Sequence, residues 1–243
     1  MNMRIVKHLL IPIVLLGGML SLPAGADRLP PGVQVIHIRQ PAYMQKIPGQ
    51  STYSKENIAA AEELAKIGDA EAQSNLGVML ASNGDYKEAV YWYKQAANAG
   101  IGAAMYNLGV LYFNGQGVEK DYSVAQRWFS SAARRGNAYA QLQLGLMSLT
   151  GQGMPKDPKQ EFYWYTQAAL QGLPAAEYDL AVMYHNGDGT ERDDVRAYAW
   201  MLLAEKGGID TSEALPIVAQ SMSSDEIAKA QRLSKSLLGD PMP

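Results

Sequence analysis

The sequence predicts an all-α protein in which pairs of helices stack into an α/α solenoid. Three kinds of feature recur every 36 residues along the 243-residue chain: a tryptophan, a glycine after it, and a Leu-Gly pair before it. Their positions are Trp92, Trp128, Trp164 and Trp200; Gly100, Gly136, Gly172 and Gly208; and Leu108-Gly109 and Leu144-Gly145, with Leu180-Ala181 as the last copy. A fixed period of about 20 to 50 residues indicates a repeat architecture.

Residues 1–26 are predicted to be a signal peptide. Arg4 and Lys7 give a positive start, LLIPIVLLGGML is a short apolar core, and Ala24-Gly25-Ala26 has small residues where a peptidase would cut. The apolar run is too short to span a bilayer, and an uncleaved membrane anchor is the alternative. We expect cleavage after Ala26 and a location in the periplasm, with secretion as the alternative.

Residues 27–53 are predicted to form an extended lead-in. They hold four prolines and show no helical period. The short run VQVIHI alternates like a strand and could instead add a strand to a partner.

Residues 54–243 are predicted to be the solenoid, with a capping helix at 54–67, four repeats at about 68–208, and capping helices at 209–239. In the first helix of a repeat, Ala140, Leu144, Gly145 and Ser148 share one face; in the second, Glu161, Trp164, Ala168 and Ala169 do. Small residues on both faces allow the helices to approach closely, and we expect the tryptophan to fill the space beside them. Ser223 and Glu226 have the spacing of a capping box at the last helix.

The loop between the two helices of a repeat is predicted to be a structural connector. The acidic stretch HNGDGTERDD (185–194) aligns with FNGQGVEKDY and TGQGMPKDPK. Each copy has two glycines, which suit a turn, and an aspartate that can cap the next helix. These aspartates are Asp121, Asp157 and Asp193, and Asp85 is expected to do the same in the first repeat, whose loop is four residues shorter.

The remaining acids of that stretch, Asp188, Glu191 and Asp194, are interpreted as a charged surface tip. An EF-hand count fails at the required glycine and glutamate positions, so calcium is not expected. We predict no metal site and no cofactor.

Composition narrows the classes of function. Without residues 1–26, the chain has 19 Lys and Arg against 24 Asp and Glu, and it lacks a basic stripe, which argues against nucleic acid as a partner. It has no cysteine, so thiolate chemistry, a cysteine zinc site and disulfides are excluded. His37 and His185 are the histidines left after cleavage. We predict no catalytic residues; a carboxylate pair is the enzymatic route left open.

The pattern A-x3-LG-x2-Y-x2-G-x-G-V-x2-D-x3-A-x2-W-x3-AA-x2-G resembles the Sel-one-like repeat family, which is related to tetratricopeptide repeats. Residues 104–136, AMYNLGVLYFNGQGVEKDYSVAQRWFSSAARRG, match it best. Ala181 in place of glycine, Ser148 in place of tyrosine and the short first loop depart from it. The resemblance implies a right-handed solenoid that binds other proteins, often in the bacterial envelope or at host contacts. Some exported relatives are associated with β-lactam or cell-wall chemistry, but this chain lacks their cysteines.

By analogy with tetratricopeptide repeats, the first helices should line a groove that binds a protein or peptide. The alternative is that many of these residues pack between repeats. The candidate groove residues are Glu71, Ser74, Val78, Tyr106, Val110, Phe113, Tyr139, Leu142, Leu146, Tyr178, Val182 and His185. We expect a non-catalytic scaffold in the envelope; a cell-wall or β-lactam enzyme and a secreted host-interaction factor are the alternatives. The sequence predicts neither the partner nor the oligomeric state.

Overall fold

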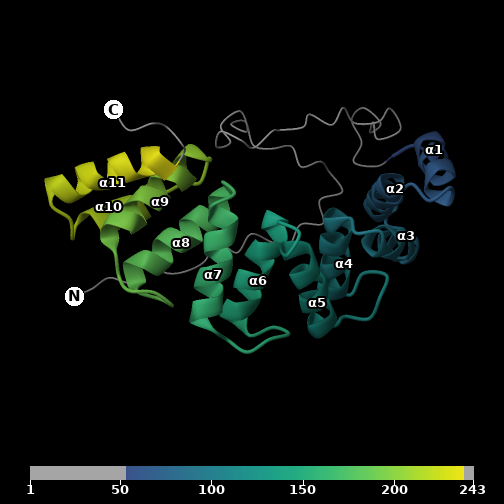
Figure 1. Cartoon of the computed structure of the whole chain (residues 1–243), viewed down its shortest axis with the longest axis horizontal. Coiled ribbons are helices and arrows are strands. Elements are labelled where there is room, and N and C mark those ends of the chain that lie inside the picture. The colour runs from purple at the N-terminus through teal and green to yellow at the C-terminus, as the bar shows by residue number, and fades with distance from the viewer. Residues whose placement is uncertain (1–52, 238–243) are drawn as a thin grey trace.

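The computed structural model describes residues 53–237 and confirms an all-α solenoid (Figure 1). The expected signal peptide, and all but the last residue of the expected lead-in, lie outside the described residues. The described residues form eleven helices and no strand. The helices are α1 (Lys55–Lys66), α2 (Ala70–Asn83), α3 (Tyr86–Asn98), α4 (Gly102–Asn114), α5 (Tyr122–Ala133), α6 (Ala138–Thr150), α7 (Pro158–Ala169), α8 (Pro174–Asn186), α9 (Asp194–Lys206), α10 (Ala214–Ala219) and α11 (Ser224–Leu237).

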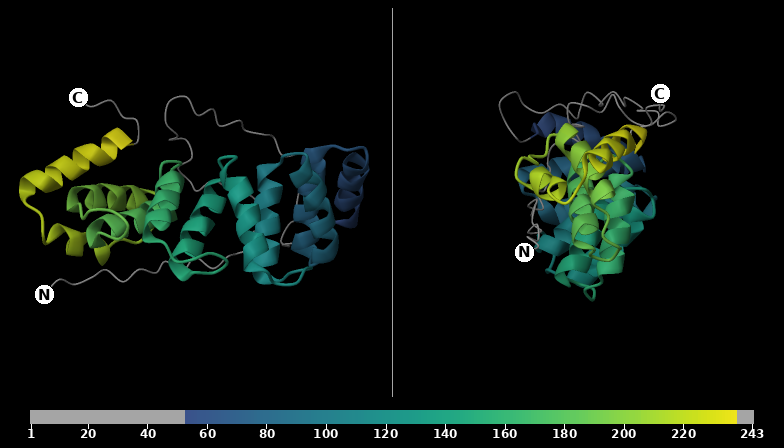
Figure 2. Two further views of the ribbon diagram at one scale, coloured as in Figure 1. Left: turned by 60° about the horizontal axis from the view of Figure 1, so that its bottom comes forward. Right: turned by 90° about the vertical axis from the view of Figure 1, so that its left-hand side faces the viewer.

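The helices follow one another along the long axis of the molecule, as the views in Figures 1 and 2 show. Four pairs, α2–α3, α4–α5, α6–α7 and α8–α9, form the stack, and most close contacts join a helix to the next one in the chain. At one end α1 packs on α2; at the other, α10 and α11 both pack on α9. The first helices of the pairs, α2, α4, α6 and α8, therefore repeat at regular intervals along the stack.

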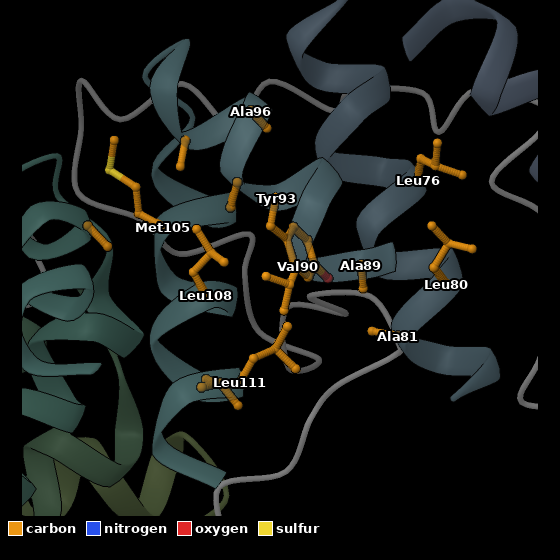
Figure 3. Close-up of a cluster of buried hydrophobic side chains, with 14 of the residues drawn as sticks. Leu76, Leu80, Ala81, Ala89, Val90, Tyr93, Ala96, Met105, Leu108 and Leu111 are labelled. Carbon is orange, nitrogen blue, oxygen red and sulfur yellow. The ribbon is translucent and has the colours of Figure 1, made fainter. Parts of the chain in front are cut away.

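The two helices of a pair meet where a glycine faces an aromatic ring. A Cβ atom on Gly77 would lie 2.6 Å from the ring of Tyr93, and one on Gly145 would lie 2.4 Å from the ring of Tyr165. Gly109 faces Phe129 in the same way. Figure 3 shows Tyr93 among the leucines and alanines of the first two pairs.

The expectation that the tryptophan fills this space is therefore wrong for the first three repeats, whereas Trp200 of the fourth is buried. In those three repeats the ring comes from the residue that follows the tryptophan: Tyr93 and Phe129 are almost completely buried, whereas Trp92 and Trp128 are only half-buried. Consecutive residues of a helix point about 100° apart, so only one of two adjacent aromatic residues can face the partner helix. In the fourth repeat, Ala181 and Met201 occupy the glycine and ring positions, and both are buried.

The long loops pack against the preceding repeat. Gly115, Gly151 and Gly187 end their helices with positive φ. Two residues later, a second glycine lies on the first turn of the previous second helix. A Cβ atom on Gly153 would lie 2.4 Å from the carbonyl oxygen of Tyr122, and Gly117 and Gly189 make the same close approach to Tyr86 and Pro158. These glycines fix the spacing between repeats.

The predicted helix caps are confirmed with one exception. The carboxylates of Asp121, Asp157 and Asp193 accept hydrogen bonds from backbone N–H groups of the following helix. Ser223 and Glu226 form the predicted capping box. Asp85, however, makes no such bond. The short loop places Asp85 directly after Gly84 with ψ at 55°, compared with 101° for Asp157, and this changes where its side chain points.

Candidate protein-binding face

The twelve candidate groove residues lie on the first helices, and we call the side of the solenoid that they define the first-helix face. The structure separates the two alternatives that the sequence left open for them. Five are buried and pack between helices: Ser74, Val110, Leu142, Val182 and His185. Seven keep exposed area: Glu71 is exposed, and the other six are half-buried, namely Val78, Tyr106, Phe113, Tyr139, Leu146 and Tyr178. The face is therefore reduced to these seven side chains, most of them aromatic or aliphatic.

Half-buried aromatic side chains of three successive repeats lie on this face, and we call them the aromatic row: Tyr106, Phe113, Tyr139 and Tyr178. The rings of Tyr106 and Tyr139, from successive repeats, lie 6.1 Å apart between their centroids. Phe113 lies about two turns further along α4, and the centroid of its ring is 4.8 Å from that of Tyr122. Burial, together with the neighbouring Tyr139, raises the pKa of Tyr106 to about 12, so its hydroxyl remains a hydrogen-bond donor at neutral pH. The row thus offers apolar ring surface combined with polar tips.

Sequence reasoning missed a contact at the C-terminal end of α2, in the first repeat. The side-chain amide of Asn83 accepts a hydrogen bond from the backbone N–H of Tyr53 at 3.1 Å and donates one to its carbonyl oxygen at 3.3 Å. Tyr53 is only 4% exposed. Its side chain neighbours that of Tyr93, which in turn hydrogen-bonds Asn107 of α4.

The shorter first loop explains why Asn83 is available for this contact. The aligned asparagines, Asn114 and Asn186, also precede a glycine, but each donates to a side chain two residues later in its loop, Gln116 or Asp188. The first repeat has no matching loop residue, because α3 begins three residues after Asn83. The only sign of this contact in the sequence was that the loop of the first repeat is four residues shorter than the others.

The other end of the face is acidic. Burial raises the pKa of Tyr178, and the nearby carboxylates of Asp179, Glu213 and Asp210 raise it further. These acids come from α8 and from the chain around the start of α10. The end of the face in the fourth repeat therefore carries a cluster of negative charge around Tyr178.

His185 is buried and belongs to a polar cluster, not to the exposed face. Its Nδ1 lies 2.7 Å from Oδ1 of Asp194, and Oδ2 of Asp194 accepts hydrogen bonds from Arg192 at 2.7 Å and Ser221 at 2.6 Å. The interpretation of Asp194 as part of a charged surface tip is therefore wrong, because its side chain is only 16% exposed and joins α8 to the C-terminal helices.

The hydrogen bonds of this cluster do not follow the serine-to-histidine-to-aspartate sequence of a hydrolase triad. Ser221 donates to the carboxylate of Asp194 and makes no hydrogen bond to the imidazole of His185. A nucleophilic serine must contact the histidine that takes its proton. The cluster is a structural connection between the last repeat and the C-terminal helices.

The comparison with family models decides the classification. The model of the Sel1 repeat matches residues 70–101, 102–137, 138–173 and 174–209, more than half of the chain. The chain belongs to the Sel1 repeat family. Each of the four Sel1 repeats contains one helix pair of the stack. This agrees with the resemblance carried by the repeat pattern.

Solved structures of other Sel1-like repeat proteins share this fold. The chain is similar to c5321, a protective antigen present in uropathogenic Escherichia coli strains, with 29% identity, a TM-score of 0.65, and coverage of 76% of this chain and 41% of that one. It is also similar to a Sel1 repeat protein from Oxalobacter formigenes, with 28% identity, a TM-score of 0.60, and coverage of 65% and 47%. This chain therefore spans less than half the length of both. No curated protein matches it.

Other kinds of site are not found in the part of the chain that the structure describes. Within residues 53–237 of this Sel1 repeat protein, no three histidine, cysteine, aspartate or glutamate side chains are grouped so that they could hold a metal ion. None of its described helices is both long and apolar enough to cross a bilayer. Sel1 repeats generally mediate protein–protein interaction, and the family is typically non-catalytic.

Proposed function

We propose that this protein is an exported, non-catalytic scaffold that binds an extended segment of a protein partner in the bacterial envelope through the first-helix face. The row of half-buried aromatic side chains formed by Tyr106, Phe113, Tyr139 and Tyr178 carries the proposal. Tyrosine offers a large contact area and few rotatable bonds, and it is enriched where binding energy is concentrated. The predicted signal peptide supports export.

An extended peptide suits this face better than a helix does. The half-buried tyrosines of this face are spread over three successive repeats, so an extended segment can contact them one after another. A helical ligand would have most of its backbone groups already paired within itself. A partner segment would therefore contact the aromatic side chains of this face through its own side chains.

Crosslinking in intact cells, followed by partner identification, tests this function. Replacing Tyr106 and Tyr178 with alanine should abolish capture of the partner and leave helicity, measured by circular dichroism, intact. A matched control replaces Tyr91 and Tyr163, which are 56% and 52% exposed on the second helices, and should leave capture unchanged. If the Tyr106 and Tyr178 variant captures the partner as wild type does, the first-helix face is not the binding surface.

A secreted host-interaction factor is the second candidate. The similarity to a protective antigen of uropathogenic strains favours it. Fractionation of the producing cells separates the two functions: an envelope scaffold is retained in the periplasm, whereas a host factor accumulates in the medium. In both cases, sequencing of the mature protein should give Asp27 as its first residue.

A further inference from the structure

Basic and acidic residues are distributed unevenly between the helices. Residues 53–237 contain 16 Lys and Arg and 22 Asp and Glu, a net charge of −6. The second helices of the first three repeats reverse this balance: with the turn residues that follow them (86–98, 122–135 and 158–170), they contain six basic residues and two acids. One of the two acids, Glu161, is buried. These helices are therefore positive at their surface, although the described part of the protein is negative.

The exposed side chains of these helices form one stripe on each helix. Positions i, i+4, i+7 and i+11 lie on the same side of an α-helix, and the 36-residue period gives the three helices equivalent positions. Of the twelve side chains, ten are exposed and two half-buried; five are basic, three are large and aromatic or aliphatic, and none is acidic. We call them the second-helix stripe: Lys87, Tyr91, Lys94 and Asn98 in the first repeat, Ser123, Arg127, Ser130 and Arg134 in the second, and Lys159, Tyr163, Thr166 and Leu170 in the third.

Two tyrosine rings of the stripe are exposed and yet held in place. Tyr91 is 56% exposed and Tyr163 is 52% exposed. Each lies edge to face against the tryptophan that follows it, with ring centroids 5.0 Å apart for Tyr91 and Trp92 and 4.8 Å apart for Tyr163 and Trp164. A side chain that is already ordered loses little conformational freedom when a ligand covers it. The stripe thus presents ordered aromatic rings between basic side chains.

We propose that the second-helix stripe docks this protein on the surface of a bilayer that contains anionic phospholipids. Tyrosine and tryptophan concentrate at membrane–water interfaces, because each has an apolar body and a polar tip. Lysine and arginine bind lipid phosphates while their alkyl stems cover apolar surface. Leu170, 55% exposed, adds a side chain for the boundary between headgroups and acyl chains. The first-helix face lies on other helices and stays available to a protein partner.

A bilayer fits the spacing of these groups better than an acidic polypeptide does. Neighbouring helices pack roughly 10 Å apart, so Tyr91 and Tyr163 are roughly 20 Å apart, with Arg127 between them. A polypeptide would need acids at fixed places along its chain to match this spacing, and it would also have to pair its own backbone groups. Lipids diffuse in the plane of the bilayer, so anionic headgroups can move to each basic side chain.

The negative charge of the rest of the molecule does not prevent docking. Charges more than about 10 Å apart are largely screened in 0.1 M salt. The first helices lie roughly 10 Å behind the second helices, so acids such as Glu71 and Asp179 contribute little at the docked surface. Beside the stripe, Glu88 is exposed, whereas Asp121 and Asp157 face the backbone N–H groups that they cap, and the positive helix ends offset part of their charge.

Sedimentation with vesicles tests the proposal on residues 27–243, the predicted mature chain. The probes are vesicles of phosphatidylglycerol mixed with phosphatidylethanolamine, and vesicles of phosphatidylcholine alone. We expect binding to the anionic vesicles and not to the neutral ones. Raising the salt from about 0.1 M to about 1 M should release the protein, because the screening length falls from about 10 Å to about 3 Å.

Neutralising two basic residues of the stripe separates local from overall charge. Lys94→Gln with Arg127→Gln should lower the partition coefficient at least about tenfold, because each basic residue near an anionic surface contributes about fivefold in affinity. The matched control, Lys229→Gln with Arg232→Gln on exposed positions of α11, changes the net charge equally and should preserve binding. Circular dichroism should show unchanged helicity in both variants, since all four side chains are exposed.

Two further variants act in opposite directions. Tyr91→Ala with Tyr163→Ala should lower vesicle binding several-fold while partner capture through the first-helix face persists. Ser123→Lys places a basic side chain at the position that Lys87 and Lys159 occupy in the neighbouring repeats, and it should raise binding about fivefold. A gain of binding cannot come from unfolding of the variant.

Four outcomes overturn the proposal. They are no binding to the anionic vesicles, wild-type binding by the stripe variants, equal loss in the α11 control, and binding of soluble polyglutamate in place of vesicles. The third would mean that net charge alone decides, and the fourth would assign the stripe to an acidic protein segment. Vesicle binding and partner capture are measured separately, so failure of the vesicle test leaves the proposed function intact.

Discussion

Position 177 carries a glutamate where two other repeats carry a glutamine. Gln73 and Gln141 donate their side-chain amides to the carbonyl oxygens of Ala65 and Ala133, each eight residues earlier. Glu177 lies eight residues after Ala169 in the same register and is 6% exposed. Burial raises its pKa from 4.5 to about 7, because the charged form is poorly solvated there.

Glu177→Gln should therefore stabilise the protein at neutral and alkaline pH. A group whose pKa is raised on folding contributes stability at low pH and loses it as the pH rises through the folded value. Wild type should thus lose stability between about pH 4.5 and pH 7. The glutamine variant should gain about 2 kcal/mol at pH 8 and less at pH 5. Urea unfolding at the two pH values measures this, with exposed Glu71→Gln as a control that should show no such dependence.

At the scale of the elements, the second glycine of each long loop sets the distance between repeats. Gly153→Ala should destabilise the protein by about 3 kcal/mol or more, because the new Cβ would meet the carbonyl oxygen of Tyr122 at 2.4 Å. Gly136 also has positive φ but has no atom within 4 Å of an added Cβ, so Gly136→Ala should cost only about 1 kcal/mol. Equal losses in urea unfolding would show that backbone conformation alone decides the cost.

The regular parts of these elements could be predicted from the sequence. The repeat register placed the helix pairs and the Asp121, Asp157 and Asp193 caps, because capping needs only local geometry. It could not decide between Trp92 and Tyr93 as the buried ring, since adjacent apolar residues give the same periodicity. The prediction that Asp85 caps α3 was wrong because the direction of its side chain depends on a backbone angle in the shortened loop.

The candidate face could be predicted only in part. Tyr106, Tyr139 and Tyr178 keep exposed area, as a binding row requires, but Val110 and Val182 pack inside. The aligned repeats share these positions, so the alignment alone cannot distinguish residues that stay exposed on the face from residues that are buried between helices. The Asn83 contact joins residues 30 positions apart and leaves no periodic trace.

At the scale of the whole molecule, Asp194 holds the C-terminal helices onto the stack. Burial acts to raise its pKa, but hydrogen bonds from Arg192, Ser221 and His185 outweigh it and hold the pKa below its ordinary value. A lowered pKa contributes stability above the unfolded value and loses it as the pH falls through the folded one. The attachment of α10 and α11 should therefore weaken in acid.

Asp194→Asn should remove about 1 kcal/mol at pH 6, because partly exposed hydrogen bonds to a charged group are lost. Hydrogen exchange should speed up in α10 and α11 before it does in α4. The difference from wild type in urea unfolding should shrink as the pH falls from the ordinary value of 3.8 down through the lowered pKa of the folded state, where wild type becomes protonated. Glu191→Gln, an exposed change in the same loop, is the control. Unchanged exchange in α10 would mean that apolar packing on α9 is sufficient.

The succession of contacts from each helix to the next has a consequence for how the chain acquires its structure. Proteins built from contacts close in sequence fold fast, because little chain entropy is lost before each contact forms. The chain also has no cysteine, so no oxidation step can delay it. A protein that crosses a membrane unfolded would then become native soon after it emerges, one helix pair at a time, without a disulfide catalyst.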